Sequence, residues 1–382
     1  MKTHLSVALL LLSSLTAPAC KSRSVWFWQE TGSPYGAAAI VGNNVLENQA
    51  ILFLKARSVK RVYGSYGTQP VTNPGVSAGW NAKLQTAGIQ SQYLMSENTW
   101  IFPTNHASLL TKINQRVLDF NNAPGRTASE RFEALHLDIE PHALSEWSSL
   151  TPTGRRDFLL LLRDTYAAVR QHLTIAGAPG FPIYADLPVW FDRLPTEGGS
   201  VGWSSAAERN QWYANIATNL TGISLMAFDQ TGFSAISNSV SWELANIAGA
   251  VVRVGLEADI GTGQTWATLA DFDAMLETVE AAFGAGHAVD IQSYKLWREA
   301  IAALPILPVA AVLEVAVPLV GGGISFDTET NFTYLIHHSA DLCAWQEILR
   351  LKSQQPGPAT WPVRFAESQG FWRITRFRMP QP

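Results

Sequence analysis

Residues 135–142 read LHLDIEPH, a run in which polar and apolar side chains alternate. Successive side chains of a β-strand point to opposite faces, so His136, Asp138 and Glu140 share one face and the apolar residues share the other. In a parallel α/β barrel the polar face of such a strand points inward. Active sites of this fold are built from inward side chains near the carboxyl ends of the strands. Asp138 and Glu140 are therefore the first candidates for catalysis.

Short strand-like runs of this kind alternate with longer amphipathic stretches between residues 24 and 300. Eight such alternations predict an α/β fold, a closed (β/α)8 TIM barrel. The clearest helices are expected over Arg155–Leu173 and Leu269–Phe283, a short one over Gly79–Thr86, and the weakest helical signal follows the sixth strand. The expected strands are Val25–Glu30, Arg61–Tyr66, Ser91–Glu97, Ala134–Glu140, Ile183–Val189, Gly222–Asp229, Val251–Glu257 and Ala288–Tyr294.

The helical periodicity ends at the segment LPILP, residues 304–308. Beyond it, β-forming runs alternate with turn signals such as the three glycines at 321–323. We therefore expect the barrel to occupy residues 20–306 and a small all-β, sandwich-like module to occupy residues 309–382. The sequence assigns no ligand to this module.

Residues 1–19 have the features of a secretory signal peptide. Lys2 precedes an apolar run, and small residues surround Pro18 before the expected cleavage point. The apolar run is too short for a membrane-spanning helix, so no membrane-spanning segment is expected. We expect an exported protein that is secreted, periplasmic or held at the cell surface. Cys20 leaves open the alternative of a lipid anchor at that residue.

Hydrophobic residues make up 47% of the chain and charged residues only 15%, which is typical of a protein with a large buried core. The net charge of −4 is spread along the sequence without a lysine or arginine run, so no nucleic-acid partner is expected. We expect an uncharged or weakly charged ligand. The two cysteines, Cys20 and Cys343, provide neither a disulfide framework nor a cysteine metal site, and no cofactor is predicted.

The alternation of His136, Asp138, Glu140 and His142 also makes a zinc or manganese site conceivable, because imidazole and carboxylate groups bind these ions. One strand supplies three ligands only with awkward geometry, however. We therefore predict no metal and interpret His136 as a buried residue that is hydrogen-bonded to a neighbouring carboxylate.

The stretch EALHLDIE, residues 133–140, resembles the fourth-strand signature D-G-x-D-x-D-x-E of family-18 chitinases. The stretch MAFD, residues 226–229, is similar to the M-x-Y-D motif of the same family at the sixth strand. The resemblance implies that Glu140 is the general acid, that Asp138 orients and stabilises the reacting intermediate, and that Asp229 orients the substrate. The chain also resembles exported barrel proteins that carry an L-D-x-E-P-H motif.

Several positions differ from the family-18 pattern. Glu133 and Ala134 replace Asp and Gly, and His136 replaces the middle Asp. Phe228 replaces a tyrosine whose hydroxyl group helps to hold the N-acetyl group of the substrate. These differences weaken the case for chitin itself as the substrate.

A second arrangement of carboxylates remains open. Asp138-Ile139-Glu140-Pro141 also resembles the Asn-Glu-Pro motif of retaining barrel glycosidases, whose nucleophile is a glutamate that ends the seventh strand. Glu257 occupies that position. Retaining enzymes hold the acid and the nucleophile about 5–5.5 Å apart, so this version predicts such a separation between Glu140 and Glu257.

Further residues are expected to bind the substrate because they lie in, at or just beyond the predicted strand ends. Sugar rings stack on aromatic faces, and carboxylates there form an acidic rim. Each rim carboxylate alone is equally well explained as a solvated loop residue or a structural ion pair. The expected substrate-binding residues are Trp28, Glu30, Glu97, Trp100, His136, His142, Asp186, Trp190, Phe228 and Tyr294.

Taken together, the sequence predicts an exported glycoside-hydrolase-like protein that acts on a polysaccharide or oligosaccharide by carboxylate general-acid catalysis. Two carboxyl groups close together repel each other as anions, which raises the pKa of at least one and favours a protonated acid. The alternative is a non-catalytic carbohydrate-binding barrel, because this fold supports many unrelated functions.

Overall fold

A computed structural model describes residues 22–283 and 288–302, together with the backbone of six strands between residues 313 and 378. The chain divides into two compact units, of which Lys21–Pro305 contains the barrel and Ile306–Pro382 contains the later strands. The signal segment expected at residues 1–19, Cys20 and Cys343 lie outside the described residues.

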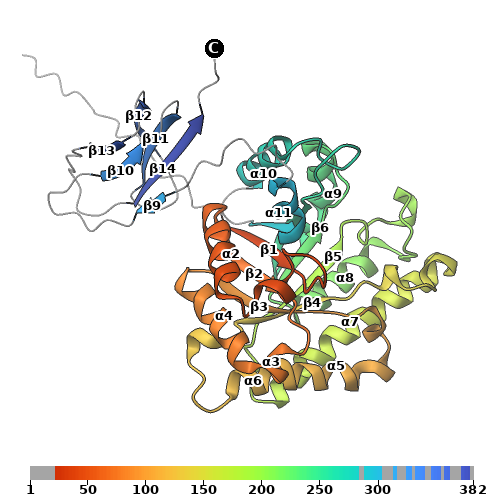
Figure 1. Ribbon diagram of the computed structural model, residues 1–382. Helices are drawn as coiled ribbons and strands as arrows, with labels where there is room; N and C mark the ends of the chain where they lie inside the picture. Colours follow the sequence, from red (N-terminus) through yellow and green to blue (C-terminus); the bar gives the residue numbers. More distant parts are fainter. Residues whose placement is uncertain are drawn as a thin grey trace, which may run out of the picture. The chain divides into compact units, whose positions relative to one another are not determined.

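Eight parallel strands close into a barrel in which each strand pairs with the next and β1 pairs with β8 (Figure 1). This confirms the predicted closed α/β barrel, and every predicted barrel strand is present. Most strands end a few residues earlier than predicted, so Glu30, Glu140 and Asp229 lie at the start of the following loops. The strands are β1 Arg23–Phe27, β2 Val59–Gly64, β3 Gln90–Ser96, β4 Ala134–Asp138, β5 Ile183–Pro188, β6 Gly222–Met226, β7 Val251–Glu257 and β8 Val289–Gln292.

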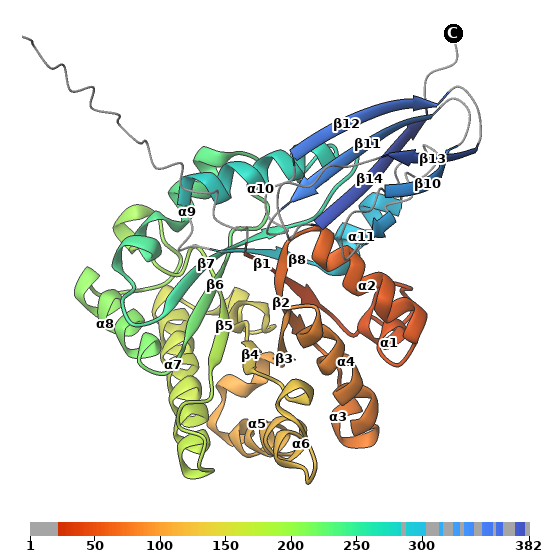
Figure 2. The same cartoon turned by 90° about the vertical axis from the view of Figure 1, so that its left-hand side faces the viewer.

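Helices surround the strands, as both views show (Figure 2). The helix predicted over Gly79–Thr86 is longer than expected and begins at Pro74, where proline favours a helix start. The weak segment after the sixth strand forms a regular helix, α9. The helices are α1 Ala37–Ile40, α2 Asn44–Ala56, α3 Gln69–Thr72, α4 Pro74–Thr86, α5 His106–Ile113, α6 Asp119–Asn122, α7 Pro152–Ile175, α8 Ala206–Ala217, α9 Phe233–Asn246, α10 Leu269–Phe283 and α11 Tyr294–Ala302.

Helix α7 shows how the sequence specifies these helices. The Thr151 hydroxyl group accepts a hydrogen bond from the Gly154 amide, which satisfies one of the free donors at the start of the helix. Leu162, Tyr166 and Val169 recur at helical spacing and are completely buried. The helix therefore packs one apolar face against the strands and leaves the other face to solvent.

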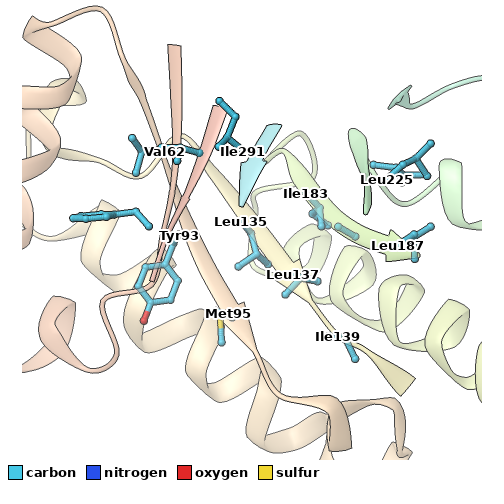
Figure 3. Close-up of a cluster of buried hydrophobic side chains, with 14 of the residues drawn as sticks. Val62, Tyr93, Met95, Leu135, Leu137, Ile139, Ile183, Leu187, Leu225 and Ile291 are labelled. Carbon is cyan, nitrogen blue, oxygen red and sulfur yellow. The ribbon is translucent and has the colours of Figure 1, made fainter. Parts of the chain in front are cut away.

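The main hydrophobic core lies between the outer face of the strands and the helices. Leu135, Leu137 and Ile139, the apolar half of the alternating β4 sequence, are each at most 1% exposed (Figure 3). They are in the same core cluster as Ile183 and Leu187 of β5. Burying such a side chain stabilises the fold by about 1.5–3 kcal/mol. This packing fixes the register of β4 and so directs His136 and Asp138 into the barrel.

The described elements of the second unit are all β-strands, in agreement with the predicted all-β module. Four form an antiparallel sheet in the order β12-β11-β14-β9, and β10 pairs with β13. Their bounds are β9 Leu313–Val315, β10 Ile324–Thr328, β11 Phe332–Ser339, β12 Gln346–Ser353, β13 Gly357–Trp361 and β14 Phe371–Arg378. None of the helices in the described part of the chain is both long and apolar enough to cross a membrane.

Candidate active site

Near the amino ends of the strands, a buried ion pair fills the barrel. The guanidinium group of Arg253 on β7 donates to both carboxylate oxygens of Asp290 on β8, with the closest contact at 2.5 Å. Arg253 also donates to Ser24, and Ser224 donates to Asp290. Burial is the largest influence on the Asp290 pKa and would raise it, but Arg253 and these hydrogen bonds together hold the pKa below its ordinary value.

Above this pair, four side chains from four strands form a hydrogen-bonded chain across the barrel. The Trp26 indole Nε1 donates to Asp186 Oδ2 at 3.0 Å, and Asp186 Oδ1 lies 2.8 Å from His136 Nε2. His136 Nδ1 lies 3.2 Å from Gln92 Oε1. None of the four is more than 2% exposed. We call this set, Trp26, Asp186, His136 and Gln92, the buried chain.

The pKa shifts within the buried chain favour uncharged groups. Burial lowers the pKa of His136 to about 3, and burial raises the pKa of Asp186 well above its ordinary value. A protonated Asp186 then donates to His136 Nε2, and the proton on His136 Nδ1 is donated to Gln92 Oε1. This proton arrangement satisfies each of these contacts without a buried charge.

Asp138 lies two residues beyond His136 on the same inward face, toward the carboxyl end of β4. It is 8% exposed, and its Oδ1 atom is buried without a hydrogen-bond partner among the described residues. Burial, then the charge of Asp186, then that of Glu140, raise the pKa of Asp138 well above its ordinary value. A hydrogen bond with Ser96 opposes these effects, and the Oδ1 atom of this buried carboxyl group has no donor among the described residues.

Glu140 is the first carboxylate that reaches solvent at this end of β4, because its side chain is 28% exposed. Its backbone amide donates to Asn98 Oδ1 at 2.8 Å, which ties the loop after β4 to the loop after β3. Burial raises the pKa of Glu140. A carboxyl group in this position holds a proton at a higher pH than a free glutamate does, which is what a general acid requires.

His142 is the nearest basic group to Glu140, with 3.9 Å between Nε2 and Oε2. Burial lowers the pKa of His142 to about 4, so the imidazole is uncharged near neutral pH. Its ring packs edge-on against the Trp190 ring, with the centroids 5.5 Å apart, and its Nδ1 atom has no partner among the described residues. Within the described residues, Glu140 forms no ion pair with a lysine or an arginine.

Aromatic rings pack together inside the barrel near the carboxyl ends of β1 and β6. The Trp26 and Phe228 ring centroids lie 6.1 Å apart in an edge-on arrangement, and Trp28 and Phe228, both half-buried, pack against the cluster that contains Trp26. Trp28 is held by a 3.0 Å hydrogen bond from its indole nitrogen to Gln292. We call Trp26, Trp28 and Phe228 the aromatic floor.

A glycine on β7 makes room for the aromatic floor. A Cβ atom built on Gly255 would lie 3.1 Å from the Trp26 ring, 3.5 Å from the Phe228 ring and 3.0 Å from the backbone carbonyl oxygen of Leu225. The first of these distances is shorter than ordinary van der Waals contact. The large indole of Trp26 is therefore accommodated because position 255 carries no side chain.

A second pair of carboxylates lies at the ends of β6 and β7. Glu257 ends β7 and is half-buried; burial, then the charges of Asp259 and Asp229, raise its pKa. Asp229 is exposed and has a positive φ of 60°, a conformation that aspartate tolerates better than most residues. Asp229 thus contributes to the electrostatic surroundings of Glu257.

Several residues predicted to bind the substrate have other contacts in the structure. His136 and Asp186 are at most 1% exposed and cannot touch a substrate directly, so they are supporting residues. Glu30 forms an ion pair with Lys295 at 3.1 Å. Glu97 is exposed, and its carboxylate accepts hydrogen bonds from Thr99 at the start of a short helix, Asn98–Ile101.

Two of the aromatic residues predicted to bind the substrate lie in the hydrophobic core outside the barrel. Trp100 is 3% exposed within the hydrophobic core between strands and helices, where Lys112 lies over its ring. Tyr294 is 2% exposed and packs edge-on against Phe27 and Phe53 in the same core. Trp100 lies just beyond a predicted strand, and Tyr294 is the last residue of one; the observed strands β3 and β8 end before them, so strand alternation no longer determines the direction of either side chain.

Sequence reasoning missed Trp26, Gln92 and the Arg253–Asp290 pair. The signal was present, because each has the inward parity of its strand. The alternative of a metal site on β4 gains no support, since the structure assembles no group of three or more histidine, cysteine, aspartate or glutamate side chains suited to a metal in the part of the chain that it describes.

No protein-family model matches the chain, and no curated protein matches it. Similar solved structures include a family GH18 chitinase from Cycas revoluta in complex with allosamidin, at 12% identity over 73% of this chain and 96% of that one, with a TM-score of 0.41. A glucosidase from Croceicoccus marinus is 11% identical over 95% of this chain and 100% of that one, with a TM-score of 0.41. Catalytic domain 2 of the Ostrinia furnacalis group II chitinase is 10% identical over 64% and 67% of the two chains, with a TM-score of 0.38.

Proposed function

We propose that this protein is a glycoside hydrolase that cleaves a polysaccharide or oligosaccharide, with Glu140 as the general acid. The observation that carries the proposal is the pair at the end of β4: Glu140 is half-buried at the barrel mouth, and Asp138 lies behind it with a buried, unpartnered oxygen. Burying carboxyl groups costs several kcal/mol, and such groups with raised pKa values cluster at functional sites.

The proposed reaction uses these groups in sequence. Glu140 donates its proton to the glycosidic oxygen while the bond between that oxygen and the anomeric carbon breaks, and the bonding electrons pass to the oxygen. Positive charge develops on the sugar ring, and the neighbouring carboxyl group of Asp138 orients and stabilises the intermediate. Water then adds to the anomeric carbon and returns a proton to Glu140, so the acid is regenerated.

Two further features support a sugar as the substrate. The half-buried rings of Trp28 and Phe228 supply apolar faces of the kind on which sugar rings stack. The motifs at β4 and β6 also resemble those of family-18 chitinases, and the chain has the closed (β/α)8 barrel that this resemblance implies. We further propose export, on the basis of the signal-like residues 1–19.

A variant of the mechanism assigns Glu257 as a nucleophile. Its half-buried position at the end of β7 and the raised pKa support a functional role. In that case Glu257→Ala would lose activity, and added azide would restore it by forming a glycosyl azide. If Glu257 is not the nucleophile, azide would restore no activity.

A non-catalytic carbohydrate-binding barrel is the second candidate, and the position of Asp229 favours it. The charge of Asp229 acts on Glu257, whereas the charges that raise the pKa of Asp138 come from Asp186 and Glu140. Among the three carboxylates implied by the family resemblance, Asp138 and Glu140 thus influence each other, while the influence of Asp229 falls on Glu257.

Hydrolysis assays decide between the two functions. The wild-type protein and Glu140→Gln would be tested on a panel of polysaccharides and aryl-glycosides, with product release as the readout. Turnover by the wild type that falls sharply in Glu140→Gln supports the enzyme. Binding of a sugar by both proteins, without turnover by the wild type, supports the binding barrel.

A further inference from the structure

The charge of the barrel is unevenly distributed along its axis. The loops that leave the carboxyl ends of the strands, between residues 28 and 293, contain one arginine, Arg193, and no lysine. Asp138 and Glu257 add two further carboxyl groups at the ends of their strands. The carboxylates of these loops are Glu30, Glu97, Glu140, Glu146, Asp192, Glu197, Asp229 and Asp259.

The opposite end of the barrel lacks this excess. The described loops that enter the strands contain Arg57, Arg126 and Arg131 beside Glu130 and Glu133. Although the net charge of the whole chain is only −4, the end of the barrel at the carboxyl ends of the strands, which we call the mouth, is strongly acidic. Because charges of one sign gathered at one end of the barrel create an electrostatic field there, such a mouth attracts cations. The sequence by itself predicts an uncharged ligand because the charges are spread evenly along the chain. The excess of carboxylates becomes visible only when the loops are grouped by the end of the barrel at which they lie.

A second observation points to a ligand at the same place. Asp138 is more than nine-tenths buried, and its Oδ1 atom has no donor among the described residues. The strand alternation of β4 directs this carboxyl group into the barrel at its carboxyl end, beside Glu140. A buried carboxyl oxygen without a donor costs free energy, and a ligand that supplies N–H groups would recover it.

The surrounding groups favour a cation over a neutral donor. Phe228 of the aromatic floor has no hydroxyl group, so it cannot donate a hydrogen bond to a neutral acyl oxygen of a ligand. The ring faces of Phe228 and Trp28 attract positive charge. Lys295, the second residue of the last barrel helix, α11, is already paired with Glu30. Asp138, Glu140 and Glu257 therefore have no lysine or arginine partner among the described residues.

We propose that the mouth binds an amino sugar as its cation: an oligosaccharide in which the ring beside Asp138 carries a protonated primary amino group. The ammonium group donates to Asp138 and lies in the field of the mouth carboxylates, and the ring packs on the aromatic floor. This inference rests on the proposed function, because it specifies the substrate class of the same site.

The test compares three oligosaccharides of equal length and linkage, made of glucosamine, N-acetylglucosamine or glucose. Binding to Glu140→Gln, which retains the site but cannot turn the sugar over, is measured by calorimetry at several pH values from mildly acidic to neutral. The glucosamine oligomer is expected to bind at least about tenfold more tightly than the other two at about 0.01 M salt. This preference should disappear at about 1 M salt, where the Debye length falls from about 30 Å to about 3 Å.

Charge-removing variants locate the effect at the mouth. Glu257→Gln and Asp229→Asn, each made in the Glu140→Gln background, should weaken binding of the glucosamine oligomer by about fivefold. Each should weaken binding of the glucosamine oligomer more than binding of the glucose oligomer. Asp164→Asn removes the same charge from an exposed position on α7, where the side chain is 54% exposed, and should change neither affinity.

The outcomes separate the two proposals. Equal or tighter binding of the glucose or N-acetylglucosamine oligomer overturns the amino-sugar inference and leaves the glycosidase proposal standing. Preferential binding of the glucosamine oligomer without turnover by the wild type supports the amino-sugar inference and contradicts the proposal that the protein is a glycoside hydrolase. Failure to bind any of the three, or an equal loss in Asp164→Asn, overturns the inference.

Discussion

The Nε2 atom of His136 lies 2.8 Å from the Oδ1 atom of Asp186, and neither side chain is more than 1% exposed. Two arrangements of protons fit this contact. Either both groups are neutral and Asp186 donates to His136, or the proton resides on His136 and the two form a buried ion pair. The pKa shifts of both residues, caused first by burial, favour the neutral arrangement.

Replacing Asp186 separates these arrangements. Asn in place of a neutral Asp186 still accepts from Trp26 and donates to His136, so Asp186→Asn should change the free energy of unfolding by less than about 1 kcal/mol. Asp186→Ala leaves both partners unsatisfied and should cost about 2–4 kcal/mol. Urea denaturation measures both values. Equal losses in the two variants would show that Asp186 is an anion.

Glu140→Gln is the direct test of the general acid. Glutamine keeps the size and the hydrogen bonding of the side chain but cannot deliver a proton, so the rate on substrates with poor leaving groups should fall by about 10²–10⁴-fold. Sugar binding should persist. Asp164→Asn on the exposed face of α7 serves as the control and should retain the wild-type rate. Wild-type turnover by Glu140→Gln would end the case for Glu140.

The pH dependence of kcat/KM should report Glu140. Because burial raises its pKa, the acid remains protonated above the ordinary glutamate value, and activity should fall as the pH rises through this raised pKa. His142 has its pKa lowered to about 4 by burial and is neutral throughout this range. The alkaline limb should therefore stay at the same pH in His142→Gln. A limb that moves in this variant would identify His142 as the titrating group.

Stability should depend on pH through Glu243 of α9, which is completely buried away from the mouth carboxylates of β4. Burial first, and the charge of Asp192 second, raise its pKa from 4.5 to about 8. The unfolded chain releases this proton at lower pH than the folded chain does. The free energy of unfolding should thus fall by a few kcal/mol as the pH rises from about 4.5 to about 8.

Urea denaturation across this pH range checks the effect. Glu243→Gln remains uncharged at every pH, so its unfolding free energy should vary less with pH than that of the wild type. Glu146→Gln, a substitution of the same kind at an exposed position, should keep the wild-type slope. The same slope in Glu243→Gln and in the wild type would exclude Glu243 as the cause.

The barrel should fold without the later strands. The sequence changes character at residues 304–308, and the chain divides into compact units between Pro305 and Ile306. A chain that ends at Pro305 should be soluble and should melt in one cooperative transition, as measured by calorimetry. An insoluble product, or a broad non-cooperative transition, would contradict this independence.

The barrel could be predicted from the sequence because each strand is a short β-forming run that can be recognised without reference to the other strands. The alternation in β4 determined which residues face the core and which face the interior, and the packing of Leu135, Leu137 and Ile139 agrees with it. The site was harder to predict. The contact between His136 and Asp186 depends on how β4 and β5 are staggered, and neither strand sequence encodes that stagger by itself.

Residues beyond the strand ends show the same limit. Trp100 follows a predicted strand and Tyr294 ends one, but each lies in a helix whose packing turns it into the outer core. Glu97 became the cap of a short helix because a carboxylate satisfies free amide groups there. Such roles depend on the local backbone path after a strand, which alternation cannot predict.

The absence of a side chain at Gly255 links two positions that are far apart in the sequence. The Trp26 indole lies in the space that a side chain at position 255 would need, so the sizes of the residues at positions 26 and 255 depend on each other. In homologous barrels, a larger residue at the position of Gly255 should occur together with a smaller residue at the position of Trp26. Either substitution made alone would be unfavourable, and the pair is therefore expected to evolve together.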